Sequence, residues 1–164
     1  MAALTGRERV ERDAEARGLP IDIRERTRAN SLEEAAQILG ITPRDIVKTL
    51  VVKRSDGTFL FALVPGDRQI GWPKLRALVG VNKLQLPDAA TALEATGYER
   101  GTITPLGSTT AWPVYADTSM TGRRVSLGAG EHGLSLFVEA DELIAALDAT
   151  LADITEPVAQ RSAD

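Results

Sequence analysis

Two strand-like runs joined by a tight turn place the strongest constraint on how this chain folds. Residues 47–53 and 58–64 are rich in β-branched and apolar side chains, and Asp56-Gly57 lies between them. An Asp-Gly pair between two such runs is typical of a β-hairpin, because Gly adopts the positive φ that the turn requires. The pattern therefore predicts two neighbouring antiparallel strands.

Further helices and strands are predicted on both sides of this hairpin. The capping box Ser31 and Glu34 opens a helix that Gly40 ends. Residue patterns predict helices at 5–17, 32–39, 73–79, 89–95 and 140–151, a short helical turn at 42–43, and strands at 21–23, 83–86, 114–117, 124–127 and 134–139. Several strand connections are too short for parallel crossovers, which favours an α+β fold with a mixed, largely antiparallel sheet and surrounding helices. We expect one domain over 1–155 and a polar, frayed tail over 156–164.

Composition excludes several kinds of chemistry. The chain of 164 residues has no cysteine and one histidine, His132. Thiol nucleophiles, thiolate zinc sites and His-rich metal sites are thereby excluded, and we expect neither a metal nor a cofactor. No apolar run approaches the length of a membrane span, so we expect a cytoplasmic protein without membrane contacts.

Charge is distributed unevenly although its sum is small. The net charge is −4; residues 1–28 carry seven Arg against six acids, and residues 139–164 carry seven acids against one base. The middle of the chain is close to neutral. An anionic ligand is therefore expected to bind in a local pocket, with a partner protein adding affinity if that ligand is a large nucleic acid.

Lys48 is the most informative charged residue. Strand alternation places it on the same face as Leu50 and Val52, and Lys53 on the other face. Burial of an ammonium group is costly without a partner, so a lysine beside apolar neighbours either lines a pocket mouth or extends from the strand end into water. The pattern alone leaves both interpretations open.

Two glycine-rich segments are candidate parts of a site. Residues 96–107 contain Gly97, Gly101, Pro105 and Gly107, and such a loop can direct amide N–H groups at a carbonyl or phosphate oxygen. A rigid connector between a helix and a strand explains the spacing equally well. Residues 128–133 lie between two predicted strands, which favours a hairpin turn with an exposed His132, unsuited to a general-base role.

In order along the chain, these segments resemble the YbaK/EbsC family, the editing domains associated with prolyl-tRNA synthetase. The resemblance covers about residues 8–155 and is carried by the motifs Val47-Lys48-Thr49-Leu50, Thr96-Gly97-Tyr98, Gly101-Thr102-Ile103-Thr104-Pro105-Leu106-Gly107, Gly130-Glu131-His132-Gly133-Leu134, and the stretch from Asp141 to Ile154.

This resemblance implies a barrel-like α+β domain and a metal-free deacylase. Such an enzyme removes a wrong amino acid from a tRNA, usually proline tRNA, and can borrow tRNA affinity from prolyl-tRNA synthetase. Lys48 would anchor the substrate end or polarise the ester, while a water, a ribose hydroxyl or a substrate thiol attacks. The substrate would lie beside Thr49, Gly101, Thr102, Ile103, Thr104, Pro105, Gly128 and Gly130.

Three positions depart from the cysteine-clearing members of the family. Gly128 stands where those members have serine, His132 where they have arginine, and Ser135 where they have aspartate. The amino acid that is cleared therefore stays open, and Ala, Ser, Thr or another small side chain fits as well. A non-catalytic module that binds an aminoacyl or nucleotide end is an alternative, as is a synthetase partner that docks through the Arg-rich first helix.

Overall fold

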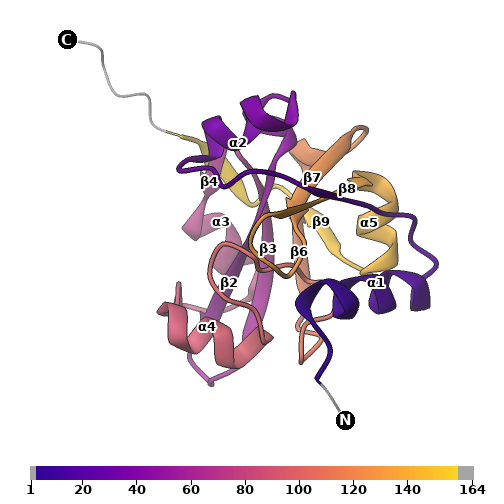
Figure 1. The fold of residues 1–164 in the computed structure, drawn as a ribbon. Helices are drawn as coiled ribbons and strands as arrows, with labels where there is room; N and C mark the ends of the chain where they lie inside the picture. Colours follow the sequence, from indigo (N-terminus) through magenta and orange to yellow (C-terminus); the bar gives the residue numbers. More distant parts are fainter. Residues whose placement is uncertain (1–2, 159–164) are drawn as a thin grey trace.

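The predicted hairpin forms the middle of the largest sheet. In the computed structural model, which describes residues 3–158, strand β2 (Val47–Arg54) pairs antiparallel with β3 (Phe59–Pro65) (Figure 1). The full strand order is β5-β2-β3-β6-β9, with β5 at Leu84–Gln85, β6 at Val114–Asp117 and β9 at Thr150–Ala152. The pairs β3–β6 and β6–β9 are parallel, so the sheet is mixed.

Two smaller antiparallel sheets flank it. One has the order β1-β8-β7, with β1 at Asp22–Glu25, β7 at Arg124–Gly128 and β8 at Leu134–Glu139. The other pairs β4 (Arg68–Ile70) with β10 (Thr155–Pro157). These sheets confirm the predicted α+β fold with mostly antiparallel pairing. Each of the three keeps two open edges in residues 3–158, so the barrel-like arrangement is not closed.

Helices begin and end largely where the sequence predicts. They are α1 (Gly6–Ala16), α2 (Leu32–Leu39), α3 (Trp72–Val79), α4 (Ala89–Thr96) and α5 (Ala140–Ala146), with short 3₁₀ helices at Pro43–Asp45 and Thr118–Met120. The side chains of Thr5, Ser31 and Asp88 accept N-terminal amide hydrogen bonds, and left-handed glycines follow α2, α3 and α4. No helix in the described part of the chain is long and apolar enough to cross a membrane.

The prediction for the last part of the chain was wrong. Helix α5 ends at Ala146 rather than at residue 151, and Asp148 adopts a positive φ of 51°. The chain then forms β9, which gains β6 as a parallel partner, and β10, which gains β4. Because these partners lie far away in sequence, the local residue pattern did not predict β9 and β10. The short strand β4 was missed for the same reason. Glu156 and Pro157, expected in the tail, lie in β10, and residues 159–164 fall outside the described residues.

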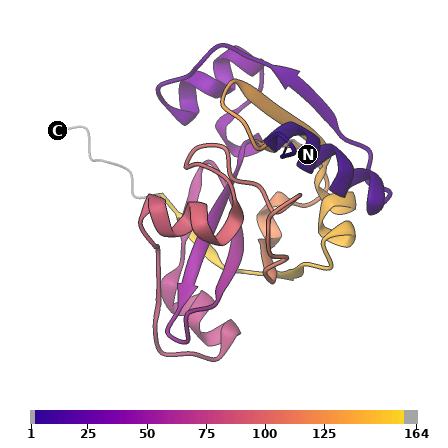
Figure 2. The same cartoon turned by 60° about the horizontal axis from the view of Figure 1, so that its bottom comes forward.

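Apolar side chains form a separate cluster on each face of the large sheet. One cluster contains Val47, Val51 and Phe61 together with residues of α1, β7 and β8. The other contains Val52 and Leu60 and packs against α3, with Leu50 at its margin. Figure 2 shows α1 next to α5 and the β7–β8 hairpin, on the side of the fold that carries the first cluster. The site described next lies beside β2, between α2, α4 and β7.

Candidate functional site

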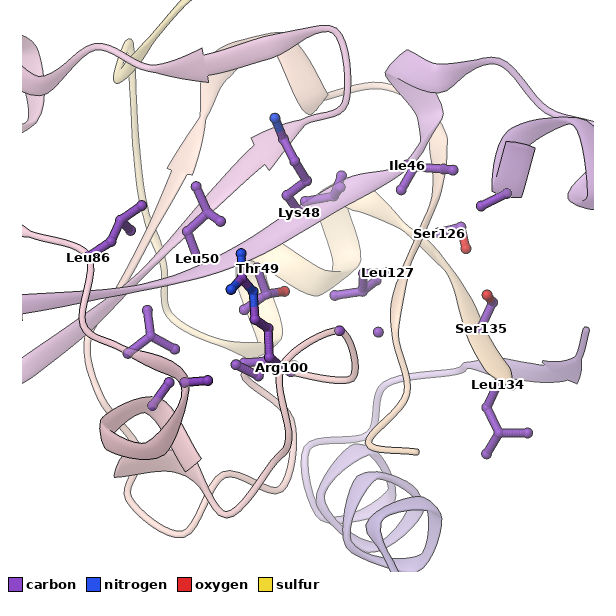
Figure 3. Close-up of a pocket in the computed structure, with 18 of the residues that line it drawn as sticks. Ile46, Lys48, Thr49, Leu50, Leu86, Arg100, Ser126, Leu127, Leu134 and Ser135 are labelled. Carbon is purple, nitrogen blue, oxygen red and sulfur yellow. The ribbon is translucent and has the colours of Figure 1, made fainter. Parts of the chain in front are cut away.

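A pocket of about 580 Å³ opens along one edge of β2 (Figure 3). Its lining includes residues 46–51 in unbroken succession. Successive strand side chains point to opposite faces, so a pocket on one face would contact only every second residue. The pocket therefore faces the edge of the strand. Its other walls come from α2 (Ala35, Leu39), the segment that starts α4 (Leu86, Pro87, Asp88, Ala89, Ala92), the loop before β6 (Arg100, Gly101, Ile103) and the β7–β8 hairpin (Ser126, Leu127, Gly128, Leu134, Ser135), with Arg26 beside that hairpin.

Lys48 lies in this lining, but its amine is turned toward β4. Its Nζ donates to the main-chain carbonyl of Arg68 at 2.7 Å. Burial lowers the pKa of Lys48 below its ordinary value, while Asp67 and Glu33 act in the opposite direction. In Figure 3, Lys48 projects to one side of β2 and Thr49 to the opposite side. Lys48 is thus partly desolvated and held, rather than extended into water.

The loop between α4 and β6 contributes Gly101 and Ile103 to the pocket. Gly101 has a φ of 91°, which a residue with a side chain rarely adopts. The Thr102 N–H donates to the Glu99 carbonyl at 3.0 Å, whereas the N–H groups of Gly101 and Ile103 have no hydrogen-bond partner within residues 3–158. The loop therefore presents two free amide donors next to the pocket.

Four other predicted site residues are not part of the pocket lining. Thr102 and Thr104 are buried, and the Thr102 hydroxyl donates to the Glu99 carbonyl at 2.8 Å. Pro105 lines a separate depression against α1. The Gly130 N–H donates to the Thr102 carbonyl at 3.0 Å, which ties the β7–β8 turn to the loop. Thr102 and Gly130 thus help to fix the loop and do not face the pocket themselves.

Gly128 lies where the loop and the β7–β8 hairpin meet. A residue without a side chain can by itself leave a pocket wall open. Instead, the carbonyl oxygen of Ile103 lies 2.5 Å from the position that a Cβ on Gly128 would take. The main chain of the loop thus fills the space, and Gly128 permits this close approach. The predicted hairpin turn is confirmed, with positive φ at Gly130 and Gly133.

Sequence reasoning missed two arginines in the lining. The Nε of Arg26 donates to the Ser135 hydroxyl at 2.7 Å, and Arg26 also pairs its main chain with Gly133. Arg100 is exposed and immediately precedes Gly101. Its place in the glycine-rich loop could have identified Arg100, but only the β1–β8 pairing brings Arg26 to Ser135. His132, as expected, is exposed; its Nε2 lies 3.0 Å from a Glu99 carboxylate oxygen.

Titratable groups in the pocket are few. Asp88 is the one carboxylate in the described lining, and its pKa is lowered chiefly by the hydrogen bond from the Thr91 N–H. Within residues 3–158, no three His, Asp or Glu side chains gather closely enough to hold a metal ion. Apolar walls, free amide donors and a few cations are suited to a small polar group joined to an anionic end.

Comparison with known proteins agrees with this fold. A crystal structure of a candidate trans-editing enzyme for prolyl-tRNA synthetase superposes with a TM-score of 0.85 and 28% identity, covering 94% of this chain and 99% of the other. The model of the aminoacyl-tRNA editing domain family matches residues 27–146. The chain belongs to this family.

Two similar proteins have names that refer to tRNA charging or deacylation. EbsC of Enterococcus faecalis, named as a candidate Cys-tRNA(Pro)/Cys-tRNA(Cys) deacylase, is 27% identical over 126 residues, which are 76% of this chain and 77% of EbsC. Proline–tRNA ligase of Thermosipho africanus is 42% identical over 78 residues, which are 48% of this chain. The matched segment is 14% of the length of that ligase.

Proposed function

We propose that the protein is a trans-editing aminoacyl-tRNA deacylase. It hydrolyses the ester of a mischarged tRNA, namely proline tRNA carrying a small wrong amino acid. One observation carries this proposal: Gly101 and Ile103, whose N–H groups have no hydrogen-bond partner in the described residues, line a pocket together with Lys48, inside the segment that matches the editing family. The similarity to proline–tRNA ligases supports the choice of tRNA and of prolyl-tRNA synthetase as a partner.

The loop amides would bind the ester carbonyl. Hydrolysis builds negative charge on this oxygen as water adds to the carbonyl carbon. Two fixed N–H donors stabilise that charge without reorganisation, because the loop is already held by Thr102 and Gly130. The bond from the carbonyl carbon to the ribose oxygen then breaks, which yields the free amino acid and a tRNA with a restored hydroxyl.

Lys48 would anchor the anionic end of the substrate. Its amine lies on the β4 side of β2 and has donors to spare after its bond to the Arg68 carbonyl. This position favours a contact with the terminal phosphate over a contact with the ester carbonyl. Thr49, on the other side of β2, and Gly128, against the loop, would border the aminoacyl group.

Deacylation assays test this function. Proline tRNA charged with Ala, Cys, Ser, Thr or Pro is incubated with the wild type, with Lys48→Ala and with the control Lys53→Ala on the same strand. We expect clearance of a small wrong amino acid, sparing of Pro, loss in Lys48→Ala and retention in Lys53→Ala. Full activity of Lys48→Ala would remove Lys48 from the mechanism. No turnover of any substrate, with a synthetase present, would favour the non-catalytic binding module.

A further inference from the structure

We propose that the open main-chain edge of β2 at Thr49 and Val51 recognises the free α-amino group of the aminoacyl moiety. The protein would then accept esters of α-amino acids and reject those whose amino group is acylated, as in a peptidyl-tRNA. This inference rests on the proposed function and adds the substrate class to it. It depends on which backbone groups of β2 have partners.

The direction of the backbone groups follows from the hairpin register. The Gly66 N–H donates to the Ile46 carbonyl at 2.7 Å, so at Ile46 the backbone of β2 hydrogen-bonds toward β3. This direction alternates along an antiparallel strand. The N–H and C=O groups of Thr49 and Val51, three and five residues further on, therefore point to the opposite edge, where the pocket lies.

The neighbouring strand gives an independent check. Val51 lies opposite Phe61 in the β2–β3 register. The Phe61 N–H donates to the Pro113 carbonyl at 2.8 Å, on the β6 side and away from β2. The Val51–Phe61 pair is thus one in which neither residue bonds to the other, and both backbone groups of Val51 face outward.

The pocket edge stays open because the strand on that side stops early. β5 pairs with β2 at Lys53, opposite Gln85. Continued two residues past the end of β5, this register brings Pro87 opposite Val51, and Pro87 has no N–H to donate. The chain then turns into α4, capped by Asp88. Near the other end of β2, backbone pairing with the β7–β8 sheet among the described residues is limited to one isolated bridge, from Ile46, just before β2, to Ser126.

Thr49 and Val51 therefore lack backbone hydrogen-bond partners on the pocket side, within residues 3–158. Their equivalent atoms lie about 7 Å apart, two strand residues at about 3.4 Å each. This length is too short to add a peptide strand but is comparable with a single aminoacyl group. The Thr49 hydroxyl is also buried without a partner. The edge thus offers polar groups that only a small ligand can satisfy.

An α-ammonium group fits the carbonyls of this edge, since it carries donors and no acceptor. With the amine at β2 and the ester carbonyl at the Gly101–Ile103 amides, the substrate would bridge two walls of the pocket. A ligand without the amine leaves a desolvated carbonyl unpaired, which weakens binding. An acylated amine also loses donors and adds bulk. The competing explanation is recognition by the Asp88 carboxylate.

Binding of hydrolysis-resistant ligands tests the inference without catalysis. The ligands are 3′-alanylamino-3′-deoxyadenosine, its propionyl analogue without the amine, and its N-acetyl form, with affinities from titration calorimetry. We expect both altered ligands to bind roughly tenfold to hundredfold more weakly than the alanyl ligand. The variant Asp88→Asn, which keeps a capping side chain for α4, should preserve this difference.

Three results would overturn the inference: equal binding of the ligands, no binding of the alanyl ligand, or loss of the difference in Asp88→Asn. The last result would assign the amine to the carboxylate instead. A failed deacylation assay is distinguishable from these, because selective binding of the alanyl ligand would support recognition of the amine even if no ester were cleaved.

Discussion

The guanidinium of Arg9 in α1 holds the carbonyl of Gly107, at the far end of the pocket loop, with an Nε-to-oxygen distance of 2.9 Å. The same side chain reaches the carbonyls of Gly97 at 3.1 Å and Thr96 at 2.9 Å, and lies over the ring of Tyr98. Both ends of the loop are thus fastened to one helix. At least one arginine of the Arg-rich first helix, Arg9, therefore bonds within the protein itself.

Arg9→Ala should destabilise the protein by about 2 kcal/mol or more, because several carbonyls lose a charged donor. Urea unfolding measures this change. Arg12→Ala is the matched control: Arg12 is exposed on the same helix and has no hydrogen-bond or ion-pair partner in the described residues, so a change within about 0.5 kcal/mol is expected. Similar losses in both variants would contradict the role given to Arg9.

Gly128→Ala should displace the loop and reduce deacylation. The added Cβ would meet the Ile103 carbonyl oxygen at 2.5 Å, and a main-chain atom cannot move aside alone. Overpacking of this kind costs about 1–3 kcal/mol. Gly71→Ala is the control, since its nearest neighbour is the flexible Lys74 side chain at 3.2 Å. Thermal unfolding and deacylation of both variants measure the effect. If Gly128→Ala had the same unfolding temperature and activity as the wild type, the loop would be able to adapt to the added Cβ.

Lys48 should make the protein relatively more stable at alkaline pH. Burial lowers its pKa in the folded state, so between this pKa and the ordinary value of 10.5 the unfolded chain binds more protons. The free energy of unfolding of the wild type, relative to Lys48→Met, should therefore rise with pH through this window. Urea unfolding at several pH values up to about 10.5 tests the direction. A flat or falling difference would mean that Lys48 is not desolvated.

Asp117 should contribute to stability at neutral pH and lose this contribution in acid. Burial alone would raise its pKa, but hydrogen bonds from Ser119, the Ile154 N–H at 3.0 Å and Thr155 outweigh it and lower the pKa. The stabilisation is present above the ordinary aspartate pKa and is lost as the pH falls through the depressed value.

Asp117→Asn tests this assignment, because an amide cannot accept all of these hydrogen bonds. We expect a loss of about 1–3 kcal/mol at pH 7, measured by urea unfolding, and convergence of variant and wild type in acid. Leu151 and Ala152 of β9 precede the Ile154 contact, so hydrogen exchange should also quicken there. A loss that is the same at every pH would show that charge at Asp117 is not involved.

Local signals in the sequence determined much of the fold. Asp56-Gly57 determined the hairpin, and Ser31, Asp88 and the glycines after the helices determined most helix ends, because turns and caps depend on neighbouring residues. The period of the strand residues also placed Lys48 with Leu50 and Val52. Family motifs identified the loop at Gly101 and the chemistry it suggests.

Tertiary structure decided what depends on distant partners. β4, β9 and β10 are three residues long and form only because strands elsewhere in the chain lie beside them. Likewise, only the folded chain turns the Lys48 amine to the Arg68 carbonyl, fills the space at Gly128 with the Ile103 main chain and brings Arg26 to Ser135. The open edge at Thr49 and Val51 has the same origin. A sequence specifies which groups a strand carries, but hydrogen bonds between remote segments determine which of them stay free.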